Sequence, residues 1–285
     1  MELEPGIHSL TTGQLPTRQL PIGREPFQGF PPPNSFLVFG TDASVLIDAG
    51  WDDAADHEAR TAYLRDVGPP PLAAIIITHR HPDHGGGALA LHRSTGAPLA
   101  SHALEREAIE RGCFGGEARI TRELRDGEEL DLGGLTLEVV HTPGHTPGCI
   151  ALFARERGAL FTTDTVMGVS TTLIRPGEGS MADYGRTLER LRSLRAATMY
   201  TGHGGPITDP ESRLQALIGH RQRRETELLD ALAGGPRMVQ ELREAIYTGL
   251  PAARERLADQ QVVSGLHRLR DDGRVRADGE RWART

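Results

Sequence analysis

The sequence contains no lysine, because all 32 of its basic residues are arginine. Lysine Schiff-base catalysis and the lysine-dependent phosphate loop of nucleotide-binding enzymes are therefore excluded. Only two cysteines are present, Cys113 and Cys149, which are too few for a disulfide framework and favour a reducing compartment. We expect each cysteine to be a small core residue and not a metal ligand.

Long apolar runs are also missing. No stretch of about 18 apolar residues occurs, and residues 1–10 lack the basic-then-apolar layout of a signal peptide. We therefore expect no membrane segment, no membrane partner and a cytoplasmic location.

The net charge of −7 is unevenly distributed along the 285 residues. Residues 1–210 carry 18 arginines against 27 acidic residues, a net charge of −9, whereas residues 211–285 carry 14 against 12, a net charge of +2. The length suits a domain of about 200 residues plus a smaller one. We predict a catalytic domain over 1–210, followed by a linking helix and a small domain over 211–285.

The middle of the chain alternates between strand and helix patterns. The β-branched run 73–77 predicts a strand buried on both faces, and strands are also expected over 35–40, 44–48, 135–140, 149–153 and 159–163. The Pro- and Gly-rich segment 13–34 predicts a surface loop.

The end of the chain predicts helices over 210–233, 239–247 and 252–271 and a hairpin over 274–284. This order is typical of a winged-helix domain. Six arginines could line a nucleic-acid face: Arg254, Arg256, Arg268, Arg270, Arg274 and Arg276. The interleaved acids Asp259, Asp271 and Asp272 instead favour a packing or homodimer role.

The decisive motif is HxHxDH, which consists of His79, His81, Asp83 and His84 and follows the buried strand directly. By chance, a chain of this composition would contain it about one time in a thousand. A strand-to-helix loop directs alternate side chains to two adjacent positions. One histidine pair can therefore bind one metal while the aspartate and the last histidine bind a second.

Three further candidate ligands, His145, Asp164 and His203, each follow a predicted strand and lie among glycines and threonines. Loops at one edge of a sheet can converge on a single site. His141 precedes a Thr-Pro-Gly turn and is expected to support that turn.

Two other residues near the motifs have open roles. Arg80 lies between two candidate ligands, so it either meets an anionic substrate or belongs to a solvated face. Tyr184 either donates a hydrogen bond in the pocket or packs at the start of a helix.

Four features follow one another along the chain: the HxHxDH motif, HTPGH at 141–145, Asp164 at the end of a predicted strand, and Gly-His at 202–203. This order resembles the metallo-β-lactamase superfamily. The resemblance implies an α/β fold, an αββα sandwich. It further implies that one metal is held by His79, His81 and His145. A second would be held by Asp83, His84 and His203, with Asp164 bridging both.

A closer resemblance rests on Ser-Thr-Thr at 170–172, Asp183-Tyr184, Ile-Gly-His-Arg at 218–221 and the winged-helix outline. Together they are similar to the beta-lactamase-like protein 2 group, which includes an endoribonuclease and thioesterases of polyketide pathways. The chain departs from that group at 29–36, where relatives tend to carry Gly-Thr-Asn-Thr. Because of this difference, the substrate is the property of the group that the resemblance predicts least well for this chain.

The resemblance implies a dinuclear hydrolase that uses a metal-bridging hydroxide, acting on a small-molecule acyl ester or thioester. Zinc suits imidazole and carboxylate ligands, which also accept iron, manganese or nickel. Asp83 and Asp164 could additionally orient the water or carry a proton. The alternatives are an endoribonuclease of single-stranded RNA, a metal-sensing winged-helix regulator without catalysis, and a redox site like that of the one-metal persulfide dioxygenases.

Overall fold

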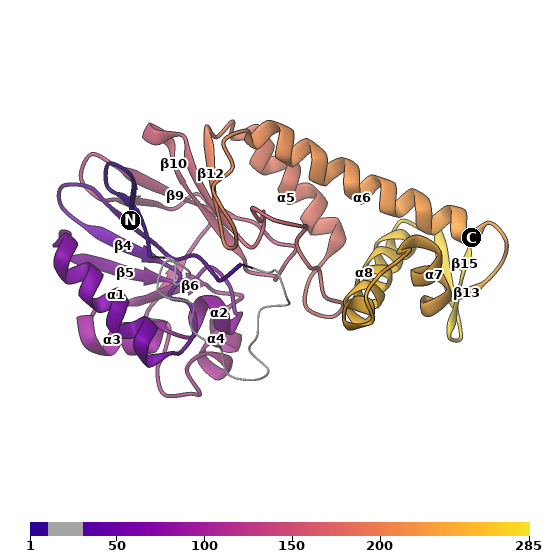
Figure 1. Cartoon of the computed structure of the whole chain (residues 1–285), viewed down its shortest axis with the longest axis horizontal. Coiled ribbons are helices and arrows are strands. Elements are labelled where there is room, and N and C mark those ends of the chain that lie inside the picture. The colour runs from indigo at the N-terminus through magenta and orange to yellow at the C-terminus, as the bar shows by residue number, and fades with distance from the viewer. Residues whose placement is uncertain (11–30) are drawn as a thin grey trace. The chain divides into compact units, whose positions relative to one another are not determined.

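A computed structural model describes residues 1–10 and 31–285 (Figure 1). The chain forms two compact units. The first comprises Met1–Thr142, Gly148–Ser170 and Ala196–Thr208, and the second comprises Pro143–Pro147, Thr171–Arg195 and Asp209–Thr285. Most of the surface loop expected over 13–34 lies outside the described residues.

The first unit contains two β-sheets. Its seven-stranded sheet has the order β1-β2-β3-β4-β5-β6-β7. These strands are β1 (Glu2–Glu4), β2 (Ile7–Ser9), β3 (Phe36–Phe39), β4 (Ser44–Ile47), β5 (Leu72–Ile76), β6 (Leu99–His102) and β7 (Arg122–Leu124). Strands β4, β5, β6 and β7 are parallel, which matches the apolar run of β5 because a parallel strand is buried on both faces.

The second sheet has the order β12-β11-β10-β9-β8. Its strands are β8 (Glu129–Asp131), β9 (Thr136–His141), β10 (Ile150–Ala154), β11 (Ala159–Thr163) and β12 (Thr198–Thr201). A short 3-10 helix, η2 (Arg155–Arg157), joins β10 to β11. Buried apolar residues of both sheets form one core, in which the ring of Phe36 lies 5.2 Å from that of Phe161 and 5.7 Å from that of Tyr200.

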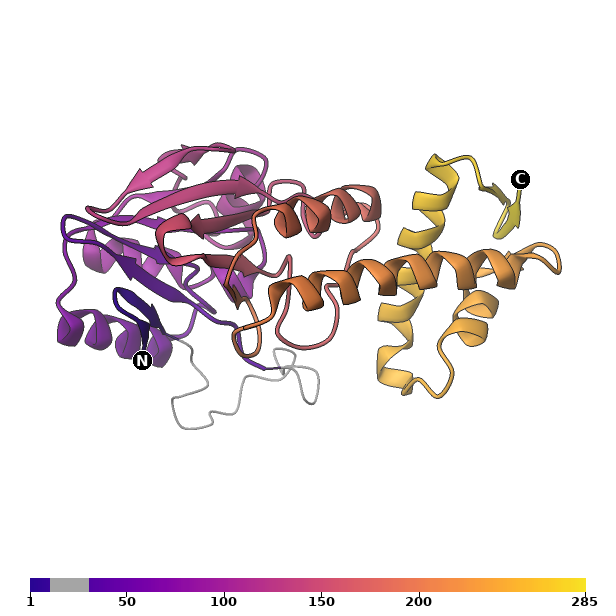
Figure 2. The same ribbon diagram turned by 90° about the horizontal axis from the view of Figure 1, so that it is seen from above.

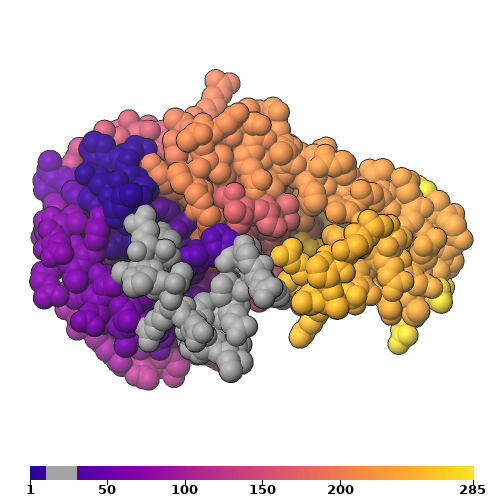
Figure 3. Space-filling view, viewed as in Figure 1, coloured from indigo at the N-terminus to yellow at the C-terminus, as the bar shows by residue number. Residues whose placement is uncertain are grey.

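Helices cover the other face of the seven-stranded sheet (Figure 1). They are α1 (Ala54–Val67), α2 (Pro82–Gly85), α3 (Ala88–Thr95) and α4 (Arg106–Gly112). Asp53 caps α1, because its side chain accepts hydrogen bonds from the backbone of Ala55 and Asp56. The sequence did not predict the N-terminal hairpin of β1 and β2, in which β1 is the edge strand at the surface (Figure 3) and β2 is buried.

The second unit is mostly helical. It contains α5 (Met181–Ser193), α6 (Pro210–Leu232), α7 (Val239–Ile246), α8 (Ala252–Asp271) and a sheet ordered β13-β15-β14. The strands are β13 (Arg237–Met238), β14 (Val275–Asp278) and β15 (Arg281–Arg284). Figure 2 shows α7 and α8 beside the C-terminal half of α6, where Leu228, Leu242 and Leu266 share one apolar core.

The helices and hairpin expected after residue 210 are therefore present, and the winged-helix assignment stays a prediction. Within residues 1–10 and 31–285, no helix is both long enough and apolar enough to cross a bilayer.

Candidate metal centre

Three strands of the first unit end at the candidate ligands. Strand β5 leads through Thr78 into the HxHxDH loop, β11 leads into Asp164, and the parallel strand β12 leads into His203. Thr163, the last residue of β11, has a φ of 44°. Left-handed backbone is costly for a β-branched residue, and such strain is typical of functional turns.

A glycine lets β12 approach Asp164 closely. A Cβ atom at Gly202 would lie 2.2 Å from Asp164 Oδ1 and 2.8 Å from the carbonyl carbon of Thr163. Only a residue without a side chain fits there. The close approach brings His203 beside Asp164.

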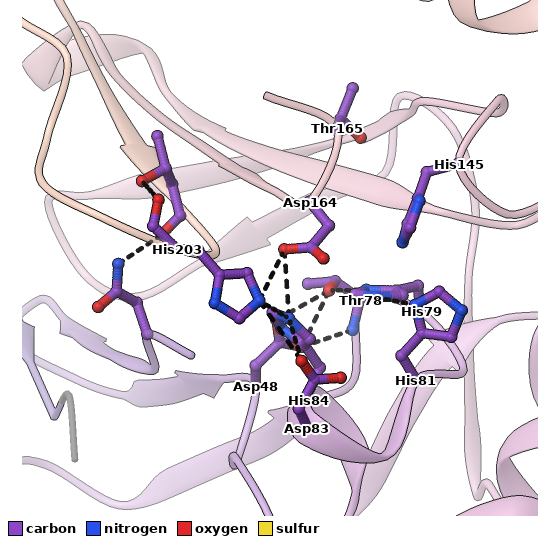
Figure 4. A network of polar contacts seen from close by, with 12 residues as sticks. Asp48, Thr78, His79, His81, Asp83, His84, His145, Asp164, Thr165 and His203 are labelled. Carbon is purple, nitrogen blue, oxygen red and sulfur yellow. Dashed lines mark hydrogen bonds and ion pairs between the residues drawn. The ribbon is translucent and has the colours of Figure 1, made fainter. Parts of the chain in front are cut away.

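One group of candidate ligands consists of Asp83, His84 and His203. Their side chains point toward one another and toward Asp164 (Figure 4). The Nε2 atom of His203 lies 3.4 Å from Asp83 Oδ2 and 3.5 Å from Asp164 Oδ1, and His84 Nε2 lies 3.2 Å from Asp164 Oδ1. Ligand atoms placed about 2.1 Å from a tetrahedral zinc ion are about 3.4 Å apart. The observed spacing therefore fits a divalent cation.

The hydrogen bonds of the two histidine rings support the same conclusion. His84 Nδ1 donates to Asp48 Oδ2 at 2.7 Å, and His203 Nδ1 donates to the carbonyl oxygen of Pro31 at 2.9 Å. Both acceptors can only accept, so Nδ1 keeps its proton in both rings and Nε2 is the atom that faces the site, where a metal can replace its proton. The two Nε2 atoms are 3.4 Å apart. Two lone pairs at this distance repel unless a proton or a cation lies between them.

A second candidate group includes His79, His81 and Asp164 of the first unit. His79 Nε2 lies 3.1 Å from His81 Nδ1. His145 comes from the short connection between β9 and β10, and its Nδ1 donates to the carbonyl oxygen of Leu173 at 2.8 Å. That bond leaves the His145 Nε2 atom as the one available for a metal.

The side chains of the site are strongly charged. Burial alone would lower the pKa of His84, but the carboxylates of Asp164, Asp48 and Asp83 outweigh it and hold this pKa well above its usual value. Burial alone would raise the pKa of Asp164, but His84 and His203 hold it well below its usual value. The Asp164 carboxylate is therefore ionised and ready to bind a cation, and a metal would displace protons from the histidines.

Asp48 is a residue that the sequence analysis missed. Its carboxylate is buried, and besides His84 it accepts hydrogen bonds from the backbone N–H and the hydroxyl of Thr78, each at 2.9 Å. Asp48 has a φ of 57°, so the chain turns sharply where β4 ends. Asp48 thus fixes the orientation of His84 and braces the start of the HxHxDH loop. Its one sequence signal was an acid at the end of an apolar strand.

Arg80 has a partner that neither of its expected roles included. Its Nε donates to Glu105 Oε2 at 2.7 Å, and its backbone N–H donates to the same oxygen at 2.9 Å. Glu105 is fully buried, and its other oxygen accepts from the N–H of Gly148 at 2.7 Å. This ion pair holds the guanidinium against α4 and the start of β10, and a substrate contact by Arg80 stays a prediction. Glu105 was also missed.

The other singled-out residues have structural roles. The ring of His141 stacks on that of His102 with centroids 4.4 Å apart, and the backbone N–H of His141 donates to the carboxylate of Asp126. Tyr184 is buried, and the guanidinium of Arg221 lies over its ring. Burial raises the pKa of both cysteine thiols to about 12, and neither sulfur belongs to a group of candidate metal ligands among the described residues.

Residues 29–203 match the sequence profile of the metallo-beta-lactamase superfamily. The chain belongs to this superfamily. The expected αββα fold and the hydrolase class are thereby confirmed. A metallo-beta-lactamase family protein from Thermus thermophilus superposes over 100% of both chains, with a TM-score of 0.77 and 27% identity.

Two curated relatives extend the comparison. A beta-lactamase-like protein 2 homolog of Caenorhabditis elegans is 28% identical over 244 residues, which cover 85% of this chain and 80% of that protein. An atrochrysone carboxyl ACP thioesterase of Aspergillus fumigatus is 29% identical over 238 residues, which cover 75% of this chain and 68% of that protein. The resemblance to the beta-lactamase-like protein 2 group is confirmed.

Proposed function

We propose that this member of the superfamily is a dinuclear metal-dependent hydrolase of acyl esters or thioesters. The observation that carries the proposal is the convergence of the His84 and His203 Nε2 lone pairs on the carboxylates of Asp83 and Asp164, at the spacing expected of ligands around one cation. The name of the Aspergillus fumigatus relative, a thioesterase, supports the substrate class.

In this proposal His79, His81 and His145 hold one metal, and Asp83, His84 and His203 hold the other. Asp164 bridges them, because it belongs to the first group and also lies 3.2 Å from His84 Nε2. Zinc is the proposed ion, since imidazole and carboxylate ligands suit it. Two bound cations would lower the pKa of a shared water toward neutrality and polarise the oxygen of the scissile bond.

The two aspartates have different exposure, which divides their roles. The Asp164 side chain is 10% exposed and the Asp83 side chain is 23% exposed. Asp83 Oδ2 faces His84 and His203, which leaves Oδ1 to hold the proton that the attacking water releases. Asp164 remains ionised and positions the other ligands.

The RNA alternative has weaker support. Arg268 pairs with Asp272 and Glu225, Arg270 pairs with Asp271, and Arg274 lies 3.9 Å from Glu225. These are three of the six arginines expected to contact phosphates, and nearby acids offset their charge. No observation on the tail favours RNA over a small acyl substrate, or regulation over catalysis.

Parallel assays of the metal-loaded protein test the proposal. The substrates are a short-chain acyl thioester, an aryl ester, a lactone and a labelled single-stranded RNA, each measured with wild type and with Asp164→Asn. We expect thioester or ester turnover that a chelator abolishes and that Asp164→Asn reduces at least 100-fold. RNA cleavage without acyl hydrolysis would reverse the assignment, and turnover that persists after full metal removal would refute it.

A further inference from the structure

A pocket of about 520 Å³ lies within the second unit, among helices α5, α6, α7 and α8. Its volume is in the range of small-molecule binding sites. Apolar side chains line it, among them Leu188 of α5, Ile218 of α6 and Val262 of α8. None of the proposed metal ligands lines it, so the pocket is separate from the metal centre.

The charged groups around this apolar pocket are mainly basic. Four arginines and two glutamates line it. Three of the arginines have carboxylate partners: Arg186 pairs with Asp183, Arg224 with Glu227, and Arg268 with Asp272. An anion in the pocket would therefore have to be recognised mainly by the fourth arginine, Arg221.

Arg221 is unusual because no carboxylate in the described part of the chain pairs with it. Its Nη1 donates to the amide oxygen of Gln261 at 3.1 Å, and its Nη2 donates to the carbonyl oxygen of Thr172 at 2.5 Å. The guanidinium lies 5.1 Å from the ring centre of Tyr184. Its Nε atom is buried and has no hydrogen-bond partner. A buried donor without a partner costs about 1–3 kcal/mol, so an acceptor from a ligand would stabilise this arrangement.

His220, the residue before Arg221, also lies in positively charged surroundings. Burial, together with Arg221, Arg224 and Arg223, lowers the pKa of His220 to about 4. His220 is therefore neutral at physiological pH, and it adds no positive charge of its own. The charge at this end of the pocket comes from arginine alone, which stays protonated at all physiological pH values.

We propose that this pocket binds an amphipathic monoanion, in which a carboxylate head on a medium-length hydrocarbon chain pairs with Arg221 and the chain lies against Leu188, Ile218 and Val262. An apolar pocket with one unneutralised arginine is complementary to such a molecule, because the hydrocarbon is buried while the carboxylate receives a charge-assisted hydrogen bond. The pocket is a second binding site and does not depend on the proposed hydrolysis.

Calorimetric titration with decanoate tests the head group. We expect saturable binding to the metal-loaded wild type and at least tenfold weaker binding to Arg221→Gln. The matched control Arg223→Gln removes the same charge from an exposed position on the same helix outside the pocket, and it should change affinity less than twofold. Decanol and butyrate should bind at least tenfold more weakly than decanoate. Decanol lacks the carboxylate, and butyrate lacks the medium-length hydrocarbon chain.

A glycine that lines the pocket provides an independent test. A Cβ at Gly185 of α5 would meet no atom within 4 Å, so Gly185→Leu places a side chain in the open pocket. Leucine also favours helix more than glycine does by roughly 0.8 kcal/mol, so this variant should fold at least as stably as wild type. We expect it to lose decanoate binding tenfold or more.

Decanoate could instead coordinate the metals, and the variants separate the two sites. Binding at the metals would persist unchanged in both Arg221→Gln and Gly185→Leu, and that result would overturn the proposal. The absence of saturable decanoate binding to wild type would overturn it as well.

Discussion

Replacing Asp48 with asparagine should weaken binding at one metal position while leaving the fold intact. In the wild type, the Asp48 carboxylate accepts the Nδ1 proton of His84 at 2.7 Å and fixes the ring with its Nε2 lone pair toward the site. An asparagine amide can still accept from the backbone N–H of Thr78. Its NH₂ group would then face His84 Nδ1 and act as a donor. The ring would respond by moving its proton to Nε2, where it blocks metal binding.

The size of the effect follows from this change of tautomer. Loss of one hydrogen-bond partner behind a metal-binding histidine typically weakens metal affinity by about 10–100-fold, or about 1.4–2.7 kcal/mol. We expect the upper end for Asp48→Asn, because the new side chain favours the wrong tautomer as well as removing a charge. Of the ligands of the other metal, His145 is oriented by the Leu173 carbonyl, and His79 Nδ1 contacts the Thr78 hydroxyl at 3.2 Å. That hydroxyl can still donate to the oxygen that asparagine keeps at position 48, so the affinity of the other position should change less than fivefold.

Competition titrations of zinc against a chromophoric chelator measure both affinities. Asp53→Asn is the matched control: it makes the same chemical change at the N-cap of α1, where asparagine caps as well as aspartate does. Circular dichroism verifies that both variants fold. An Asp48→Asn protein that is folded and binds two zinc ions as tightly as wild type would refute the role of Asp48.

Three further substitutions test other parts of the site. Glu105→Gln should lower the free energy of unfolding, measured in urea, by about 3 kcal/mol, because it leaves the guanidinium of Arg80 without its buried partner; a loss under about 1 kcal/mol would contradict this. Gly202→Ala should reduce metal content below one ion per chain, since its methyl group would collide with Asp164, and full metal content would show that the turn can relax. Asp164→Ala should reduce kcat at least 100-fold more than His141→Ala, and equal losses in steady-state assays would count against a bridging role.

The elements with strong local signals were predictable from the sequence. The β-branched run of β5 and the HxHxDH motif after it indicated the position of the main ligand loop, because metal-binding side chains cluster at short spacing and buried parallel strands are continuously apolar. Strands β10 and β11 and helices α6 and α8 were likewise confirmed within one or two residues at each end.

Residues whose role depends on distant partners were not predictable. Asp48 lies 30 residues before Thr78, and Glu105 lies 25 residues after Arg80, so no local pattern links either pair. Strands such as β1, β2 and β7 have three residues each, too few to show an alternating pattern. The Pro31 carbonyl that orients His203 belongs to a Pro-rich loop whose composition indicates only that it is a loop.

Elemental analysis of the freshly purified protein tests the central claim most directly. If Asp83, His84 and His203 hold a second ion beside that of His79, His81 and His145, wild type contains about two divalent metal ions per chain and His84→Ala contains about one. A content of one ion or fewer in unchelated wild type, or an unchanged content in His84→Ala, would contradict the two-metal site and the bridging position of Asp164.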